Sequence, residues 1–189
     1  MGLVAKRSKI RFTYHDYKSL PESETKRYEL LDGELVMVPA PSSYHQSISK
    51  RIEFVLYQRL EKEGLGEVLD APIDVVLGEG DDREVVQPDI IFISKERSQI
   101  IKEEEIEGAP DLVIEILSPA TEKRDRAYKK SLYARYGVKE YWIVDPRNKV
   151  IELYKLGEEG FELQKEYKMG EILKSLLFQG LEIDLREVF

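Results

Sequence analysis

DLVIEILSP, residues 111–119, is the stretch of sequence that decides the fold. It is apolar, rich in β-branched residues and stopped by Ser-Pro, which predicts a buried strand. A carboxylate, Glu115, nevertheless lies in its middle. Burying an unpaired carboxylate is costly, so this group is expected to be neutralised, ion-paired or bound to a metal. Which of these applies decides the function of the protein.

The composition limits the class of protein. The chain has 189 residues, of which 42% are apolar and 35% charged, so we expect a single globular domain over residues 1–189. Residues 1–10 are expected to be a flexible basic lead. The absence of cysteine excludes disulfides and thiolate metal sites and suits a reducing cytoplasm. Because no stretch resembles a signal peptide or a membrane span, we expect a cytoplasmic protein without membrane contact.

The net charge of −8 argues against a protein that coats DNA non-specifically, because such proteins need a basic surface. A nuclease is still compatible with this charge. Carboxylates that hold a metal ion add negative charge, and the bound cation reverses its sign locally.

The remaining pattern predicts a mixed sheet with helices packed on it. The turn Asp32-Gly33 indicates a hairpin over residues 28–38. Helical spacing and capping residues predict helices at residues 13–20, 44–63 and 122–136. The segment 95–110 is charged and loop-like. The other strands are expected at residues 68–77, 85–94, 140–144, 149–156 and 161–167, with short extended segments at the sheet edge at 172–178 and 181–185.

A second carboxylate can reach Glu115. Alternate residues of a strand share one face, so Asp111, Val113, Glu115 and Leu117 point in the same direction. Asp89 begins the preceding strand, after a proline. If the two strands are neighbours in a suitable register, Asp89 and Glu115 meet. A hard cation between them would then relieve the repulsion of the two carboxylates.

A lysine is predicted to point inward from the helix at residues 122–136. Asp125, Lys129, Leu132 and Tyr136 share one helical face, and the two large residues make it the packed face. An inward Lys129 near two carboxylates could orient a water or stabilise developing negative charge. The alternative is a purely structural Glu115–Lys129 pair that bridges strand and helix. In that case Asp89 and Asp111 are only strand-entry residues.

Several motifs together resemble the Uma-two family of restriction endonucleases, within the PD-(D/E)XK nuclease superfamily. The resemblance covers most of the chain. It implies a restriction-endonuclease-like α/β (α+β) fold, in which a mixed central sheet is flanked by helices, with an N-terminal β-hairpin and a C-terminal β extension. Its core would be one helix, three strands, a helix and a strand. The motifs are YELLDGEL at 28–35, His45, QPD at 87–89, APDLVIEILSP at 109–119, LYA at 132–134 and GVKEYWIVDP at 137–146.

The resemblance implies metal-dependent hydrolysis of phosphodiester bonds in DNA. Asp89 matches the superfamily's Pro-Asp element, and Glu115 matches its second acid. Leu117 stands where the superfamily usually has a lysine, and Lys129 matches the position where this family carries its lysine instead. Asp89, Glu115 and the Ile116 carbonyl would hold Mg²⁺ or Mn²⁺, while Lys129 orients the attacking water or screens charge.

Four further residues are candidates for contacts to the ligands or the substrate: Glu29, His45, Asp111 and Asp125. Glu29 is alternatively a charge on the hairpin face, and His45 alternatively has a local role at its helix start. The expected partners are DNA and a second copy of the chain, because a homodimer supplies two sites for cutting two strands. The alternative function is a catalytically inactive nuclease-fold protein that binds or regulates, which the acidic charge and the displaced lysine favour.

Overall fold

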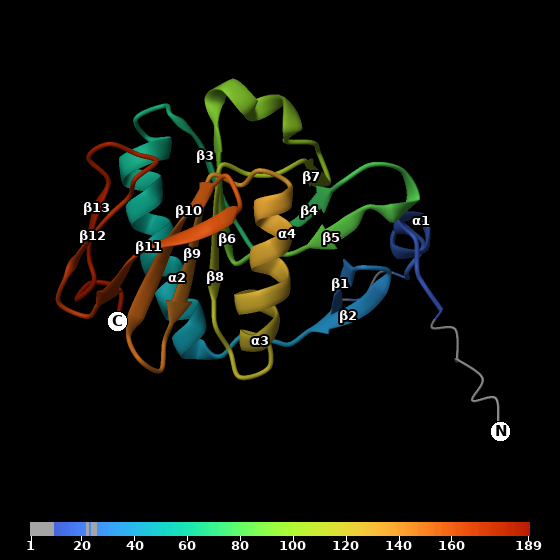
Figure 1. Ribbon diagram of the computed structural model, residues 1–189, viewed down its shortest axis with the longest axis horizontal. Coiled ribbons are helices and arrows are strands. Elements are labelled where there is room, and N and C mark those ends of the chain that lie inside the picture. The colour runs from blue at the N-terminus through green and yellow to red at the C-terminus, as the bar shows by residue number, and fades with distance from the viewer. Residues whose placement is uncertain (1–9, 22, 24–25) are drawn as a thin grey trace.

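The structure, a computed structural model, describes residues 10–21, 23 and 26–189 (Figure 1). The basic lead expected at residues 1–10 lies outside this range except for its last residue. The stretch at residues 111–119 contains β8 (Leu112–Ile116), in which every residue is buried. It lies between β6 (Ile90–Ser94), which is antiparallel to it, and β9 (Glu140–Asp145), which is parallel.

These strands belong to a six-stranded sheet with the order β11-β10-β9-β8-β6-β3. Its remaining members are β3 (Gly66–Asp70), β10 (Val150–Gly157) and β11 (Gly160–Lys168). The core expected from the family resemblance corresponds to α2 (Ser43–Leu56), β3, β6, β8, the helix after β8, and β9.

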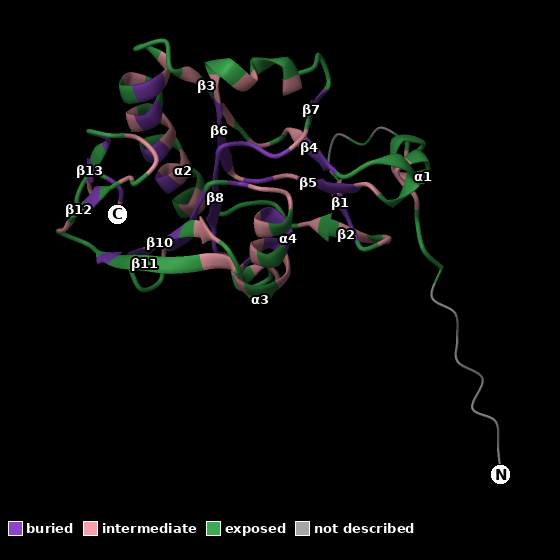
Figure 2. Ribbon diagram, turned by 45° about the horizontal axis from the view of Figure 1, so that its top comes forward, coloured by how far each residue is buried: buried purple, intermediate pink, exposed green. Residues whose placement is uncertain are grey.

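The two faces of β8 pack into separate parts of the core, as the alternation of its residues predicts. Ile114 and Ile116 pack with Ile48 and Ile52 of α2. Val113 packs on the opposite side, in the cluster that holds Leu132 and Tyr133 of α4 (Lys130–Arg135). Helices α2 and α4 therefore cover opposite faces of the sheet (Figure 1), and the central strands are buried between them (Figure 2). Fully burying each aliphatic side chain contributes about 1.5–3 kcal/mol.

A second, five-stranded sheet has the order β2-β1-β5-β4-β7. It begins with the predicted hairpin, and its tight turn is formed by Asp32 and Gly33, which both have positive φ. The strands of this sheet are β1 (Arg27–Leu31), β2 (Glu34–Val38), β4 (Asp74–Leu77), β5 (Glu84–Val86) and β7 (Glu105–Glu107).

The prediction of one strand at residues 68–77 and one at residues 85–94 was wrong. Each is two strands that belong to different sheets. The first run breaks at Ala71-Pro72, and the second breaks at Gln87-Pro88-Asp89. Proline has no N–H to donate to a ladder, so a strand pairs poorly across it and the chain passes from one sheet to the other. The expected loop at 95–110 also contains β7, which pairs in parallel with β4.

The helices match their predicted ranges but contain irregular turns. Thr13 caps α1 (Tyr14–Lys18). A π-helical segment, Tyr57–Glu61, extends α2. The later helix consists of α3 (Glu122–Arg124), a π-helical turn at Asp125–Lys129, and α4. Short 3₁₀ turns lie at Gly80–Asp82 and Lys95–Ile100.

The C-terminal segments do not join the edge of the main sheet, which corrects the expectation. β12 (Ile172–Lys174) and β13 (Glu182–Asp184) pair with each other as a separate hairpin-like sheet. Their apolar residues, including Leu173 and Ile183, pack into the cluster that contains α2. Within the described ranges, no helix is long and apolar enough to span a membrane.

Candidate functional site

The carboxyl end of β8 brings Asp89 and Glu115 to one edge of the sheet. Asp89 directly precedes β6, which pairs antiparallel with β8 so that Ile90 lies opposite Ile114. The carboxylate of Asp89 accepts a hydrogen bond from the Ile116 N–H at 2.7 Å. The two strands are therefore neighbours, and the charge of Asp89 acts on Glu115.

Lys129 points inward and contacts three carboxylates. Its ammonium nitrogen lies 2.7 Å from Glu29 Oε1, 2.9 Å from Glu115 Oε1 and 3.7 Å from Asp125 Oδ1. The residue is only 3% exposed. The π-helical turn between Asp125 and Lys129 directs both of these side chains into the interior, and such turns are often found at functional sites.

Glu29 comes from the other sheet. It lies on β1, and its Oε1 also accepts a hydrogen bond from the Gln87 N–H at 3.0 Å. Its Oε2 is buried and receives no hydrogen bond in the described part of the chain. The site therefore draws its acids from both sheets, with Lys129 between them.

The charges of this cluster shift each other's protonation. Burial raises the pKa of Glu115 well above its usual value, and Asp125, Asp89 and Glu29 add to the rise, although Lys129 opposes it. Burial alone would lower the pKa of Lys129, but the carboxylates of Glu115, Glu29 and Asp125 raise it above its usual value. These carboxylates therefore favour the ammonium form of Lys129.

His45 lies at the start of α2, beside the end of β8. Its Nε2 is 3.1 Å from the Ile116 carbonyl oxygen and 3.3 Å from Asp89 Oδ2. Burial would lower the pKa of His45, but the hydrogen bond and charge of Asp89, together with the carbonyl, raise it. His45 therefore contacts two of the three groups that the family resemblance assigns to metal binding.

Asp111 is the one candidate that the structure does not bring to this cluster. It lies at the opposite end of β8, about 16 Å from Ile116 at the rise of a strand. Its carboxylate accepts a hydrogen bond from the Ser94 N–H at 2.8 Å and pairs with Lys139 at 2.6 Å and Arg97 at 3.2 Å. These contacts tie β8 to the neighbouring segments.

One residue of the cluster, Tyr133, escaped the sequence reasoning. Tyr133 donates its hydroxyl to Glu115 Oε1 at 2.6 Å. It lies one helical turn after Lys129, so the same face rule could have found it. Arg124 lies 3.6 Å from Glu29 Oε2, and nothing in its spacing sets it apart from the other basic residues of its helix.

The acids lie at the floor of an open cleft of about 1230 Å³. Its walls come from the start of α2, the end of β8, the following helix and the two proline-containing crossings between the sheets. The lining includes every candidate except Asp111, namely Glu29, His45, Asp89, Glu115, Ile116, Asp125 and Lys129.

The donor set fits a hard divalent cation. In residues 10–21, 23 and 26–189, no three His, Asp or Glu side chains form a ready metal cage by themselves. The set implied by the resemblance, however, has two carboxylates and the Ile116 carbonyl, all of them oxygen donors. Buried oxygens of Glu29 and Asp125 also lack a hydrogen-bond partner among the described residues. Four carboxylates face the cluster, so an added cation would relieve their repulsion.

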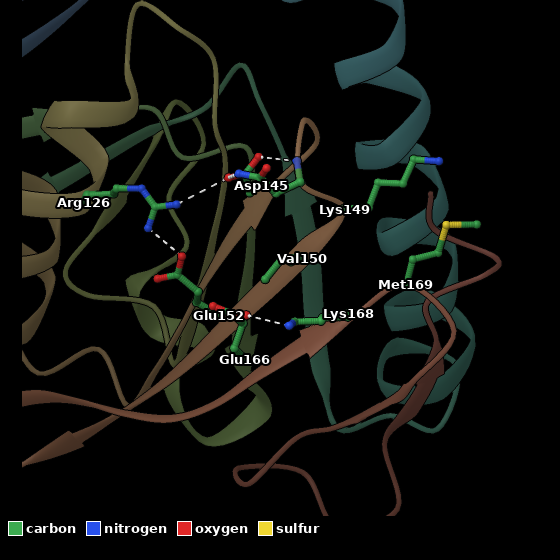
Figure 3. Close-up of a pocket in the computed structure, with 9 residues that line it drawn as sticks. Arg126, Asp145, Lys149, Val150, Glu152, Glu166, Lys168 and Met169 are labelled. Atoms are coloured by element: carbon green, nitrogen blue, oxygen red, sulfur yellow. Dashed lines mark hydrogen bonds and ion pairs between the residues drawn. The ribbon is translucent and has the colours of Figure 1, made fainter.

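A second hollow, of about 610 Å³, lies beside β10 and β11 (Figure 3). Its acids are balanced by nearby cations. Arg126 pairs with Glu152 at 2.6 Å and with Asp145 at 3.6 Å, and Lys168 lies 3.9 Å from Glu166. These pairs are partly exposed, and this hollow has no buried acid cluster comparable to that of the cleft.

Comparison with solved structures identifies a protein of the same fold. A crystal structure described as a "putative nuclease belonging to DUF820", from Anabaena variabilis ATCC 29413, superposes with a TM-score of 0.75. The match covers 94% of this chain and 97% of that chain at 20% identity. It shows that the chain has the fold of that protein, which confirms the expected mixed-sheet fold class.

Sequence comparison extends the match. The "Uncharacterized protein slr1290" of Synechocystis sp. (strain ATCC 27184 / PCC 6803 / Kazusa) is 26% identical over 160 residues, which are 84% of this chain and 82% of that protein. The model of the Uma2 family, described as "Putative restriction endonuclease", matches residues 14–186. This range contains both sheets and the whole acid cluster. The chain therefore belongs to the Uma2 family of restriction-endonuclease-like proteins.

Proposed function

We propose that this protein is a metal-dependent endonuclease that hydrolyses phosphodiester bonds in DNA. The observation that carries the proposal is the cluster at the floor of an open cleft, in which three buried carboxylates surround Lys129 and the half-buried Asp89 lies at the neighbouring strand end. Family membership supports nuclease chemistry in this cleft. A cluster kept only for stability would gain nothing from lying at the floor of an open cleft.

Asp89, Glu115 and the Ile116 carbonyl would hold the metal, Mg²⁺ or Mn²⁺. When bound, the metal would polarise the phosphate and lower the pKa of the attacking water. The water oxygen forms a bond to phosphorus while the bond from phosphorus to the leaving sugar oxygen breaks. The leaving oxygen takes up a proton, so the products are a phosphate monoester and an alcohol.

Lys129 would act on the acids of the site. Its ammonium holds Glu29 and Glu115 at fixed positions and offsets part of their charge. Tyr133 donates to the same oxygen of Glu115 and so restricts its rotation. His45 contacts Asp89 and the Ile116 carbonyl, and would orient these two ligands.

The test combines metal binding with cleavage. We expect the wild-type protein to bind Mn²⁺ in calorimetry, and Asp89→Asn to lose that binding. Glu115→Gln and Lys129→Ala should each abolish cleavage of plasmid DNA in Mg²⁺ or Mn²⁺, while circular dichroism shows a retained fold. Asp81→Asn, which changes an exposed acid remote from the cleft, is the matched control and should behave as wild type.

The results also separate the alternatives. Retained cleavage in both Glu115→Gln and Lys129→Ala would reject the assignment of the site. Absence of both metal binding and cleavage in the wild type would favour a catalytically inactive binding or regulatory protein, which the close pairing of Lys129 with Glu29 and Glu115 also suits. If Glu115→Gln lowered the free energy of unfolding by more than about 2 kcal/mol in the absence of metal, a purely structural Glu115–Lys129 pair would be favoured.

We further propose that the partner is double-stranded DNA in the cytoplasm and that the active form is a homodimer. Each chain carries one cleft, and cutting both strands requires two. Sedimentation at micromolar concentration should give twice the mass of one chain. A monomer that only nicks plasmid DNA would contradict the dimer.

A further inference from the structure

The ammonium of Lys129 is occupied by protein groups. Its nitrogen lies at hydrogen-bond distance from Glu29 and Glu115, at 2.7 and 2.9 Å, and the carboxylate of Asp125 stands farther off at 3.7 Å. Because the residue is almost fully buried, a phosphate could reach its nitrogen only after one of these pairs had opened. Lys129 is therefore suited to holding the acids together, and a different cation must meet the negative charge of a substrate.

Arg124 is the cation in the cleft whose donors are least satisfied. Its guanidinium lies 3.6 Å from Glu29 Oε2, which is beyond hydrogen-bond distance. Its Nε is buried and has no acceptor among the residues that the structure describes. The side chain is 19% exposed and lines the cleft beside Asp125 and Lys129. A buried N–H without an acceptor is unfavourable, so the empty side of this guanidinium favours an incoming oxygen.

The chemistry of the guanidinium selects the ligand. It presents five N–H donors in a planar fork, which matches two oxygens of one phosphate. Arg27, Lys50 and Arg147 also line the cleft, but Lys50 and Arg147 are exposed, and among the described residues none of the three has a buried donor without an acceptor. Arg124 lies beside the acid cluster, 3.6 Å from Glu29 Oε2, and lines the same cleft as Asp89 and Glu115.

We propose that Arg124 binds the substrate phosphate that enters the cleft, and that it, rather than Lys129, supplies the positive charge that positions the nucleic acid. This inference rests on the proposed function. It divides Lys129 and Arg124 between two tasks. Lys129 organises the acids of the protein, and Arg124 contacts the phosphate of the substrate.

The experiment measures DNA binding without cleavage. A short fluorescent DNA duplex is titrated with Arg124→Gln, Arg124→Lys and wild-type protein in Ca²⁺, and anisotropy is recorded over a range of salt concentrations. Arg124→Gln should weaken binding at least about tenfold and reduce the slope of log K against log salt by about one. Arg124→Lys keeps the positive charge but lacks the planar guanidinium. Its affinity for DNA should therefore lie between those of the wild type and Arg124→Gln. The control is Arg59→Gln, which changes an exposed arginine in the π-helical segment that extends α2.

Two further readouts separate substrate contact from a structural role. Mn²⁺ binding and thermal stability should be unchanged in Arg124→Gln if the residue contacts the phosphate. In cleavage, its loss should raise KM more than it lowers kcat. A variant that loses Mn²⁺ affinity in step with DNA affinity would overturn the inference, because Arg124 would then act by supporting Glu29.

The outcomes also distinguish this inference from the proposed function. If wild type and Arg124→Gln bind DNA equally, with the same salt slope, Arg124 is not the phosphate contact, although the nuclease proposal stands. If the wild type neither binds nor cleaves DNA, both proposals fail. Should Arg124→Gln fold poorly, Arg124→Lys alone still decides, because a binding affinity equal to wild type would reject the bidentate contact.

Discussion

Glu115 shows how a buried charge can be retained at the level of a single residue. It is 4% exposed, yet its carboxylate receives hydrogen bonds from Lys129 and Tyr133. Removing one partner of such a pair leaves the other buried and unpaired, which typically costs about 3–5 kcal/mol. A loss of activity in Lys129→Ala therefore shows a role in catalysis only if the fold of the variant is checked at the same time.

Asp111 supports a pH-dependent prediction. Burial alone would raise its pKa, but Lys139, the Ser94 N–H and Arg97 hold it below the usual value. Its contribution to stability is therefore complete above the unfolded value of about 3.9 and is lost as the pH falls through the lower folded value. We expect Asp111→Asn to lower the free energy of unfolding at neutral pH by about 1–3 kcal/mol.

Urea unfolding at neutral pH and in acid checks this expectation. The difference between Asp111→Asn and wild type should narrow as the pH falls below about 4. Mn²⁺ binding should be unaffected, since Asp111 does not line the cleft. A difference that stays constant in acid would show that the carboxylate's charge contributes nothing at this position.

Residue patterns predicted part of the site. The apolar run around Glu115 and the helical face of Lys129 both indicated inward charges, because burial leaves a periodic trace in the sequence. Glu29 was identified only by the family resemblance. Arg124 has no periodic signal, since its inward direction depends on the cleft that several distant segments form around it.

At the level of elements, Glu140 fastens the C-terminal segment to the main sheet. Lying in β9, it accepts hydrogen bonds from the Trp142 indole, the Ser175 hydroxyl and the N–H groups of Leu176 and Leu177. These contacts join β9 to the stretch between β12 and β13. The segment after β11 is therefore anchored by one buried carboxylate as well as by its apolar residues.

Glu140→Gln should loosen this segment. The amide offers only one acceptor oxygen, so at least one buried N–H loses its partner, and we expect a loss of about 1–3 kcal/mol. Hydrogen exchange at the amides of Leu176 and Leu177 should become faster than in wild type. Glu166→Gln, on the exposed face of β11, serves as the control. Unchanged exchange in Glu140→Gln would show that apolar packing alone holds the segment.

The sequence located most elements but not the division into two sheets. Hydrophobic pattern shows that a stretch is a buried strand, and it contains no information about which sheet the strand joins. The runs at 68–77 and 85–94 therefore looked continuous, although each crosses between sheets beside a proline. β7 was hidden because two of its three residues are glutamates.

For the molecule as a whole, the net charge of −8 opposes DNA binding, so we expect the attraction to come mainly from the cations that line the cleft. Each phosphate contact contributes about −0.9 to the slope of log K against log salt. We expect a slope no steeper than about −4 per chain, measured by anisotropy in Ca²⁺. A slope twice as steep would place additional basic contacts outside the cleft. The lining residues on which the expectation rests are Arg27, Lys50, Arg124 and Arg147.

The distribution of the acid cluster along the chain has a consequence for biosynthesis. Glu29 lies in one sheet, Glu115 in the other, and the lysine that joins them follows Glu29 by a hundred positions. A chain that leaves the ribosome from its N-terminus can form the hairpin early, but it has no assembled cleft until the helix that carries Lys129 has emerged and packed. Fragments released before that point, by stalled translation or by proteolysis, therefore lack the complete acid cluster.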